Sequence, residues 1–67
     1  MKREAKLKQI GAACRMKRVK HRATMQDIAD KTGTTRQNVW AFELGRNNNA
    51  FLYNYYMEEL DKDFPLV

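Results

Sequence analysis

One stretch constrains this chain more than any other, the run from Thr24 to Gly45, because it carries the start and stop signals of two short helices. Thr24 is a favourable N-cap residue, and Asp27 follows it at the spacing of a capping box, in which each side chain bonds the other residue's backbone amide. Gly33 can adopt the left-handed conformation that ends a helix without a Cβ clash. The sequence therefore predicts a helix over residues 25–32.

The same signals recur directly after this first helix. Thr35 is a second N-cap residue with Asn38 three positions later, and Gly45 marks the end of a helix over residues 36–44. Two capped helices joined at a glycine form the pattern of a helix-turn-helix unit.

The flanking segments also read as helices. Residues 3–21 place three residues at helical spacing on one face, Leu7, Ile10 and Cys14. A second apolar stripe lies opposite and either packs against the C-terminal segment or contacts another protein; it consists of Ala12, Met16 and Val19. Asn49 can cap a further helix over residues 50–60. The prediction is a single all-α domain over residues 1–67, a compact arrangement of four helices with or without a short fifth element.

The C-terminal segment carries more aromatic residues than one core face requires. Tyrosine and methionine are enriched at protein interfaces, and the tail over residues 61–67 ends in an apolar group that Pro65 holds extended. We expect this segment to pack on its own domain or on a second copy of the chain, with an edge strand as one form of the tail. The candidate interface residues are Tyr53, Tyr56, Phe64 and Leu66.

Charge narrows the class of partner. The net charge is +5 and the isoelectric point is about 9.7, which favours an anionic partner such as nucleic acid. Residues 1–23 hold nine lysines and arginines against one glutamate, whereas residues 24–67 hold four basic and seven acidic residues. A solvated helix face is the alternative explanation of the basic residues.

The reactive residue types exclude several other functions. One cysteine, Cys14, rules out an internal disulfide, and with one histidine, His21, it leaves too few ligands for a metal site. We expect Cys14 in the core and His21 at the surface. The sequence offers no nucleophile with a base and no phosphate-binding glycine loop, so neither an enzyme nor a cofactor nor a small-molecule substrate is expected. No apolar run could span a membrane, and a cytoplasmic, nucleoid-associated protein is expected.

The predicted helix over residues 36–44 offers side chains that can read DNA. Its outward side carries Gln37, Ala41 and Leu44, flanked by Arg36, Asn38 and Trp40. Arginine can bond the O6 and N7 atoms of guanine, glutamine can pair with adenine, and alanine can contact the methyl group of thymine. Asn38 lies near the helix N-terminus, where backbone amides also favour a phosphate. A solvated polar face would explain the same residues.

Three groups of residues carry a resemblance to a known family. They are Ile10-Gly11, Cys14 and Arg18; then Thr24, Ile28-Ala29, Gly33-Thr34-Thr35 and Val39; and finally Phe42-Glu43, Gly45-Arg46 and Asn47. In these residues the chain resembles the lambda-repressor-like helix-turn-helix family of phage repressors, Cro-like proteins and Xre-type regulators. The resemblance covers a little over half of the chain.

The resemblance implies a role for each matching position. The base-reading positions hold Arg36, Gln37 and Ala41, and the phosphate positions hold Asn38, Arg46 and Asn47. Arg18 and Glu43 occupy positions that often form a buried ion pair between the first helix and the end of the recognition helix. The two capping residues Thr24 and Thr35 join the phosphate-binding candidates, because backbone amides at helix starts suit a phosphate.

Two positions depart from the family pattern. Met25 stands where the family commonly has a glutamine that holds a phosphate, so this contact either moves to Gln26 or is absent. Trp40 stands where a small or polar residue is more usual, and it packs toward the first helix, contacts the DNA or seals a protein interface. Packing is our first choice, and Trp40 also stays among the base-reading candidates.

The expected function is that of a small phage-type, Cro-like repressor of transcription. It would insert helix 36–44 into the major groove of double-stranded DNA as a homodimer, on a palindromic operator with half-sites roughly 34 Å apart. The alternative is an adaptor or antirepressor that keeps the fold and acts on a second regulator protein through its aromatic C-terminal helix. Binding to DNA should weaken steeply with salt, whereas binding by an adaptor should not.

Overall fold

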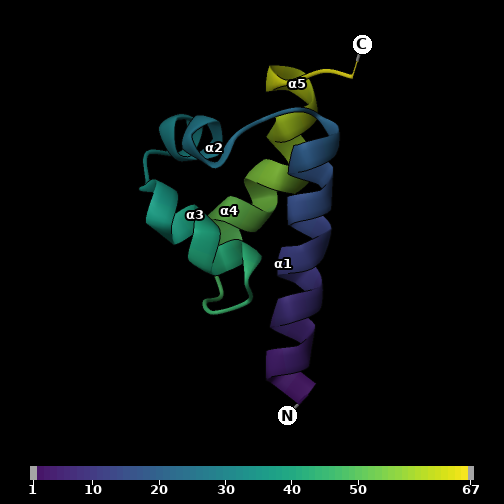
Figure 1. The fold of residues 1–67 in the computed structure, drawn as a ribbon, viewed down its shortest axis with the longest axis vertical. Coiled ribbons are helices and arrows are strands. Elements are labelled where there is room, and N and C mark those ends of the chain that lie inside the picture. The colour runs from purple at the N-terminus through teal and green to yellow at the C-terminus, as the bar shows by residue number, and fades with distance from the viewer. Residues whose placement is uncertain (1, 67) are drawn as a thin grey trace.

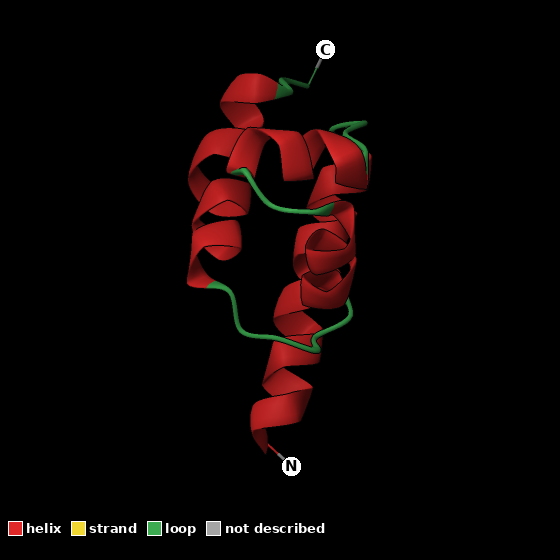
Figure 2. Cartoon of the chain, turned by 90° about the vertical axis from the view of Figure 1, so that its left-hand side faces the viewer, coloured by secondary structure: helices red, strands yellow, loops and turns green. Residues whose placement is uncertain are grey.

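The computed structural model describes the backbone of residues 2–66 and the side chains of residues 5–66. In chain order the helical elements are α1 (Lys2–Lys20), α2 (Met25–Thr32), α3 (Arg36–Glu43), α4 (Ala50–Asn54), the π-helical turn η1 (Tyr55–Glu59) and α5 (Leu60–Asp63). Figure 1 shows α1 as a long upright helix, with α2 and α3 to its left. The α4–α5 segment rises toward the C-terminal end of α1. Figure 2 shows loops between the helices and no strand among the described residues, which confirms the all-α prediction.

The local capping signals form as hydrogen bonds. The hydroxyl of Thr24 accepts the amide of Asp27 at 3.0 Å, and the carboxylate of Asp27 accepts the amide of Thr24 at 2.9 Å. Gly33 ends α2 in the left-handed conformation with a φ of 70°. The hydroxyl of Thr35 accepts the amide of Asn38 at 3.1 Å and opens α3, which ends at Glu43.

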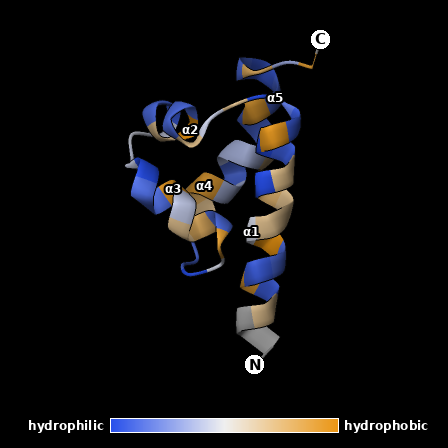
Figure 3. Ribbon diagram, in the orientation of Figure 1, coloured by the Kyte–Doolittle hydropathy of each residue, from blue (hydrophilic) through white to orange (hydrophobic). Residues whose placement is uncertain are grey.

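The core lies where α1 meets the other helices. Its most deeply buried members are Cys14, Ile28, Ala29, Val39, Leu52, Tyr56 and Leu60. Figure 3 shows hydrophobic and hydrophilic segments alternating along α1, as a helix with one inward face requires. Cys14 is fully buried as predicted, and this burial raises the pKa of its thiol to about 11.

A close approach of backbones joins α1 to α3. A Cβ atom added to Gly11 would lie 2.5 Å from the carbonyl oxygens of both Phe42 and Glu43. Only glycine leaves room for this contact, so Gly11 sets how near the end of α3 comes to α1.

The predicted helix over residues 50–60 is instead interrupted by the π-helical turn η1 and continues through α5 to Asp63. The wider turn coincides with two consecutive buried tyrosines, Tyr55 and Tyr56, whose rings meet edge to face at an interplanar angle of 90°. A regular α-helix separates consecutive side chains by about 100°, so burying both rings deep in one core is easier where the helix is widened.

The second stripe of α1 stays uncovered. Met16 is 70% exposed and Val19 is 53% exposed, and Ala12 is exposed as well. Packing of this stripe against the C-terminal segment, one of the two alternatives, is therefore wrong.

The tail is fastened to the end of α1 by a histidine. The side chain of His21 is only 7% exposed; its Nδ1 lies 2.6 Å from the carbonyl oxygen of Phe64, and its Nε2 lies 3.4 Å from the Asp61 carboxylate. Because a carbonyl oxygen can only accept, Nδ1 donates the hydrogen. The prediction of a surface histidine is wrong, and residues 64–66 form no edge strand because this contact holds them against α1 instead.

Among residues 2–66, none of the helices combines the length and the apolar composition that crossing a membrane requires.

Candidate nucleic-acid interface

A buried ion pair holds the C-terminal end of α3. The guanidinium of Arg18 donates to both carboxylate oxygens of Glu43, at 2.7 Å from Nε and 3.0 Å from Nη2. Its Nη1 donates to the carbonyl oxygen of Ala23 at 2.9 Å. Both residues of the pair are buried, and α1, the following loop and α3 are tied together at this point.

A third side chain completes this cluster. The hydroxyl of Tyr56 donates to Oε2 of Glu43, so the carboxylate accepts three hydrogen bonds. Burial, together with this hydrogen bond, raises the pKa of Tyr56, and the hydrogen bond to Glu43 raises the pKa of Arg18. The phenol therefore stays neutral and the guanidinium charged, which keeps the network intact at ordinary pH.

The opposite side of α3 faces outward. Arg36 and Gln37 are exposed, Trp40 is 41% exposed, and Ala41 is half-buried. Within the part of the chain whose side chains are described, Arg36 and Gln37 make no hydrogen bond or ion pair. The four base-reading candidates thus share one helix, and two of them keep every polar atom free for a partner.

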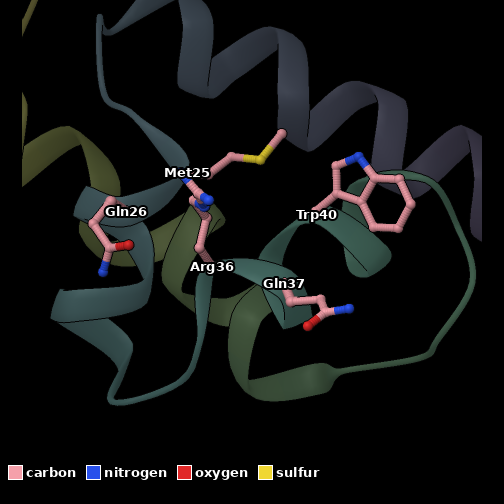
Figure 4. A pocket seen from close by; sticks show the side chains of 5 residues that line it. All are labelled: Met25, Gln26, Arg36, Gln37 and Trp40. Carbon is pink, nitrogen blue, oxygen red and sulfur yellow. The ribbon is translucent and has the colours of Figure 1, made fainter.

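A shallow depression adjoins this face. It is lined by Met25, Gln26, Arg36, Gln37 and Trp40. Figure 4 shows that these side chains come from the start of α2 and from α3. The departure from the family pattern at Met25 therefore lies beside the departure at Trp40, although 15 positions separate them in the sequence.

The phosphate-binding candidates differ in whether their side-chain hydrogen-bond donors are already used within the protein. The hydroxyl oxygens of Thr24 and Thr35 accept the capping amides, so their hydrogens remain available to a phosphate oxygen. The side-chain carboxamide of Gln26 donates to the carboxylate of Asp30 at 2.8 Å, and the side-chain carboxamide of Asn38 donates to the hydroxyl of Thr34 at 2.9 Å. Both amides would have to exchange or share these bonds to hold a phosphate.

The loop after α3 adds a cation to the same side of the molecule. The guanidinium carbon of Arg46 lies 5.1 Å from the centre of the Trp40 ring, a cation–π contact. Trp40 is 41% exposed, so it is partly covered, and its packing toward α1, our first choice, stays a prediction. Among the described residues, the carboxamide oxygen of Asn47 is buried without a hydrogen-bond partner. A phosphate oxygen accepts hydrogen bonds, so the carboxamide nitrogen is the side-chain group of Asn47 that could bond it.

The candidate interface residues separate into two groups. Tyr56 is fully buried in the cluster with Glu43, so its assignment to an interface is wrong. Phe64 packs against the core of its own chain. Tyr53 and Leu66 are 41% and 54% exposed and remain able to meet a partner.

Sequence reasoning missed the roles of two residues. Tyr56 belongs to the ion-pair cluster, and its spacing of four from both Leu52 and Leu60 is the signal that could have placed it inward. His21 fastens the tail through a residue 43 positions away, and no local pattern indicates such a contact.

Comparisons of the chain with protein-family models, with curated proteins and with solved structures found no match.

Proposed function

We propose that this protein is a sequence-specific regulator that binds double-stranded DNA and places α3 in the major groove. The observation that carries the proposal is the pair Arg36 and Gln37, which are exposed and have no hydrogen-bond or ion-pair partner among the side chains of residues 5–66. They lie on the outward face of a helix whose inward face is fixed by Glu43. These are the side-chain types that bond guanine and adenine edges in two places at once. A helix about 10–12 Å across fits a major groove about 12 Å wide.

Charge supports the same proposal. The first turn of α3 contains no acidic residue, and Arg36 opens it. The backbone amides at this helix start would face the phosphates flanking the groove, together with the hydroxyl of Thr35 and the guanidinium of Arg46. A homodimer on a palindromic operator would double the few contacts that one small domain can make, with Tyr53 and Leu66 as the exposed residues at its interface.

The decisive experiment is selection of bound sites from random duplexes at low salt. We expect a palindromic site, and we expect Arg36→Ala and Gln37→Ala each to lower the affinity for it by about tenfold or more, since one bidentate base contact contributes roughly 1–3 kcal/mol. Glu58→Ala, at an exposed position on η1, is the matched control and should keep the affinity. If the selection enriched no sequence, this function would be excluded.

A second function follows from the uncovered apolar residues. Met16 and Val19 on α1, and Phe51, Tyr53 and Met57 on the C-terminal helical segment, are all exposed, which suits an adaptor that acts on another regulator. An adaptor would keep its partner's affinity when Arg36 or Gln37 is replaced. It would also bind with little dependence on salt, whereas affinity for DNA falls steeply as salt rises.

A further inference from the structure

The depression beside α3 combines two large apolar side chains with a polar rim. Met25 is half-buried and packs partly on the core, and Trp40 is 41% exposed; both line the depression. Figure 4 shows the Met25 side chain extending along the depression in the direction of the indole. The other lining residues, Gln26, Arg36 and Gln37, are polar or cationic, and none carries a carboxylate. The depression thus suits a ligand that is anionic overall and has a small apolar group.

The indole of Trp40 is fixed in place from the loop after α3. Arg46 lies over its ring at 5.1 Å, so the ring is held without being buried. Exposed tryptophan next to a methionine thioether leaves apolar surface in water, and this surface is covered only when something apolar enters the depression.

Major-groove base edges present only one apolar group. The edges of guanine, adenine and unmodified cytosine are hydrogen-bond donors and acceptors, and the exception is the C5-methyl group of thymine. A cytosine methylated at C5 presents the same group. The apolar part of the depression therefore matches a pyrimidine C5-methyl.

Helical spacing sets where this methyl would lie. Trp40 stands four positions after Arg36 and three after Gln37, so the three side chains are neighbours on one helix surface. The methyl-bearing pyrimidine should then adjoin the base pair that Arg36 or Gln37 bonds.

We propose that Met25 and Trp40 together form a seat for the C5-methyl of a pyrimidine and make this protein selective for thymine or 5-methylcytosine next to the pair read by Arg36 or Gln37. The inference rests on the proposed function, because the seat works only with α3 in the major groove. Trp40 is here a specificity-determining residue, and Arg46 is the residue that positions it.

The test replaces single thymines of the selected duplex by deoxyuridine, which removes the methyl group and changes nothing else on the base edge. At one thymine position in each half-site, this replacement should lower the affinity of the protein for the duplex about fourfold, which is the effect of leaving one methyl group unburied. Exchanging that thymine for cytosine and for 5-methylcytosine distinguishes the two sources of the methyl, since the methylated base should bind about fourfold better than the unmethylated one.

Protein variants assign the effect to the seat. Trp40→Ala and Met25→Ala should bind the thymine and deoxyuridine duplexes equally, whereas Phe51→Ala, an exposed aromatic residue on α4, should keep the fourfold difference. If Trp40→Ala fails to fold, the deoxyuridine series with the unchanged protein still decides. Sequence-selective binding that is insensitive to every methyl group would overturn the inference and leave the proposed function standing. A methyl effect that persists in both variants would overturn the assignment to Met25 and Trp40, and a failure to enrich any sequence would overturn both proposals.

Discussion

The two faces of α3 are held by opposite kinds of contact. On the inward face Val39, Phe42 and Glu43 are at most 4% exposed, and Glu43 accepts hydrogen bonds from α1 and from η1. On the outward face Arg36 and Gln37 are exposed and have no partner within the described residues. The difference means that the position of α3 is set from inside the domain, while the residues that would meet DNA can change without moving it.

Two arginines make the contrast concrete. Arg18 is 8% exposed, and its guanidinium donates three hydrogen bonds inside the protein. Arg36 is exposed, and its guanidinium donates to no other residue that the structure describes. An arginine of the first kind stabilises the fold through groups that would otherwise be buried unpaired, whereas one of the second kind adds little to the fold and has its donors available to a partner.

The starts of α2 and α3 differ in a related way. Both are capped by threonine, but the carboxylate of Asp27 bonds the backbone at the start of α2, whereas the first turn of α3 has no acid. A carboxylate at a helix start stabilises the helix and repels a phosphate. The start of α2 is thus stabilised by its carboxylate, whereas the start of α3 has no carboxylate that would repel an anion.

The largest effect should come from breaking the inward face at Glu43. Glu43→Ala leaves the guanidinium of Arg18 and the hydroxyl of Tyr56 buried without their acceptor, which costs about 3–5 kcal/mol for one partner of a buried pair. In a chain this small such a loss should unfold most of the protein at 37 °C. Thermal unfolding followed by circular dichroism measures it, with the exposed Glu58→Ala as the control; a melting curve like that of the unchanged protein would contradict the structural role of Glu43.

Raising the pH should weaken the interior next. Burial, and after it the charge of Glu43, raises the pKa of Cys14 from 9.0 to about 11, so the unfolded thiol loses its proton before the native one does. The contribution of this thiol to the free energy of unfolding is therefore fully present below pH 9. It falls by about 2–3 kcal/mol as the pH rises from 9 to 11. Burial raises the pKa of Tyr55 and Tyr56 as well, which acts in the same direction.

Denaturant unfolding at pH 8, 9, 10 and 11 measures this loss. The matched variant is Cys14→Ala, whose free energy of unfolding should fall less steeply over the same range because one of the titrating groups is gone. All other groups are common to both proteins, so their effects cancel in the difference. Parallel pH profiles would show that the thiol is not the group responsible.

A smaller effect should follow from separating α1 and α3. Gly11→Ala raises helix propensity, yet its Cβ would meet the backbone of Phe42 and Glu43 at 2.5 Å, and overpacking of this kind costs about 1–3 kcal/mol. Gln9→Ala introduces the same residue at an exposed position of α1 and should leave the melting temperature unchanged or slightly higher. A more stable Gly11→Ala protein would mean that the two helices can part without loss.

The sequence predicts features of this fold where the partners are close along the chain. The caps at Thr24, Thr35 and Asn49 each need a partner only three residues away, so residue type and spacing suffice to locate them. The ion pair of Arg18 and Glu43 was implied by the family resemblance alone, because a charged residue on an inward face carries no sign of its partner 25 positions away.

Other features depend on how distant segments meet. The contact of His21 with Phe64, the widening at η1 and the stacking of Arg46 on Trp40 arise only after the helices have packed. For the same reason the sequence indicates the residues that we propose to read bases but not the depression that joins Met25 to Trp40.

The smallest effect on stability should come from the outward face, and it tests the contrast directly. Arg36→Ala removes a side chain that has no hydrogen-bond or ion-pair partner in the described part of the chain, so the free energy of unfolding should stay within about 0.5 kcal/mol of that of the unchanged protein. Arg18→Ala removes the same atoms from the interior and should cost several times more, because Glu43 is left buried without its cation. Denaturant unfolding of the two variants under one set of conditions makes the comparison. Equal losses would mean that α3 is held from both faces, and then a change to the exposed residues of its outward face could not leave the fold undisturbed.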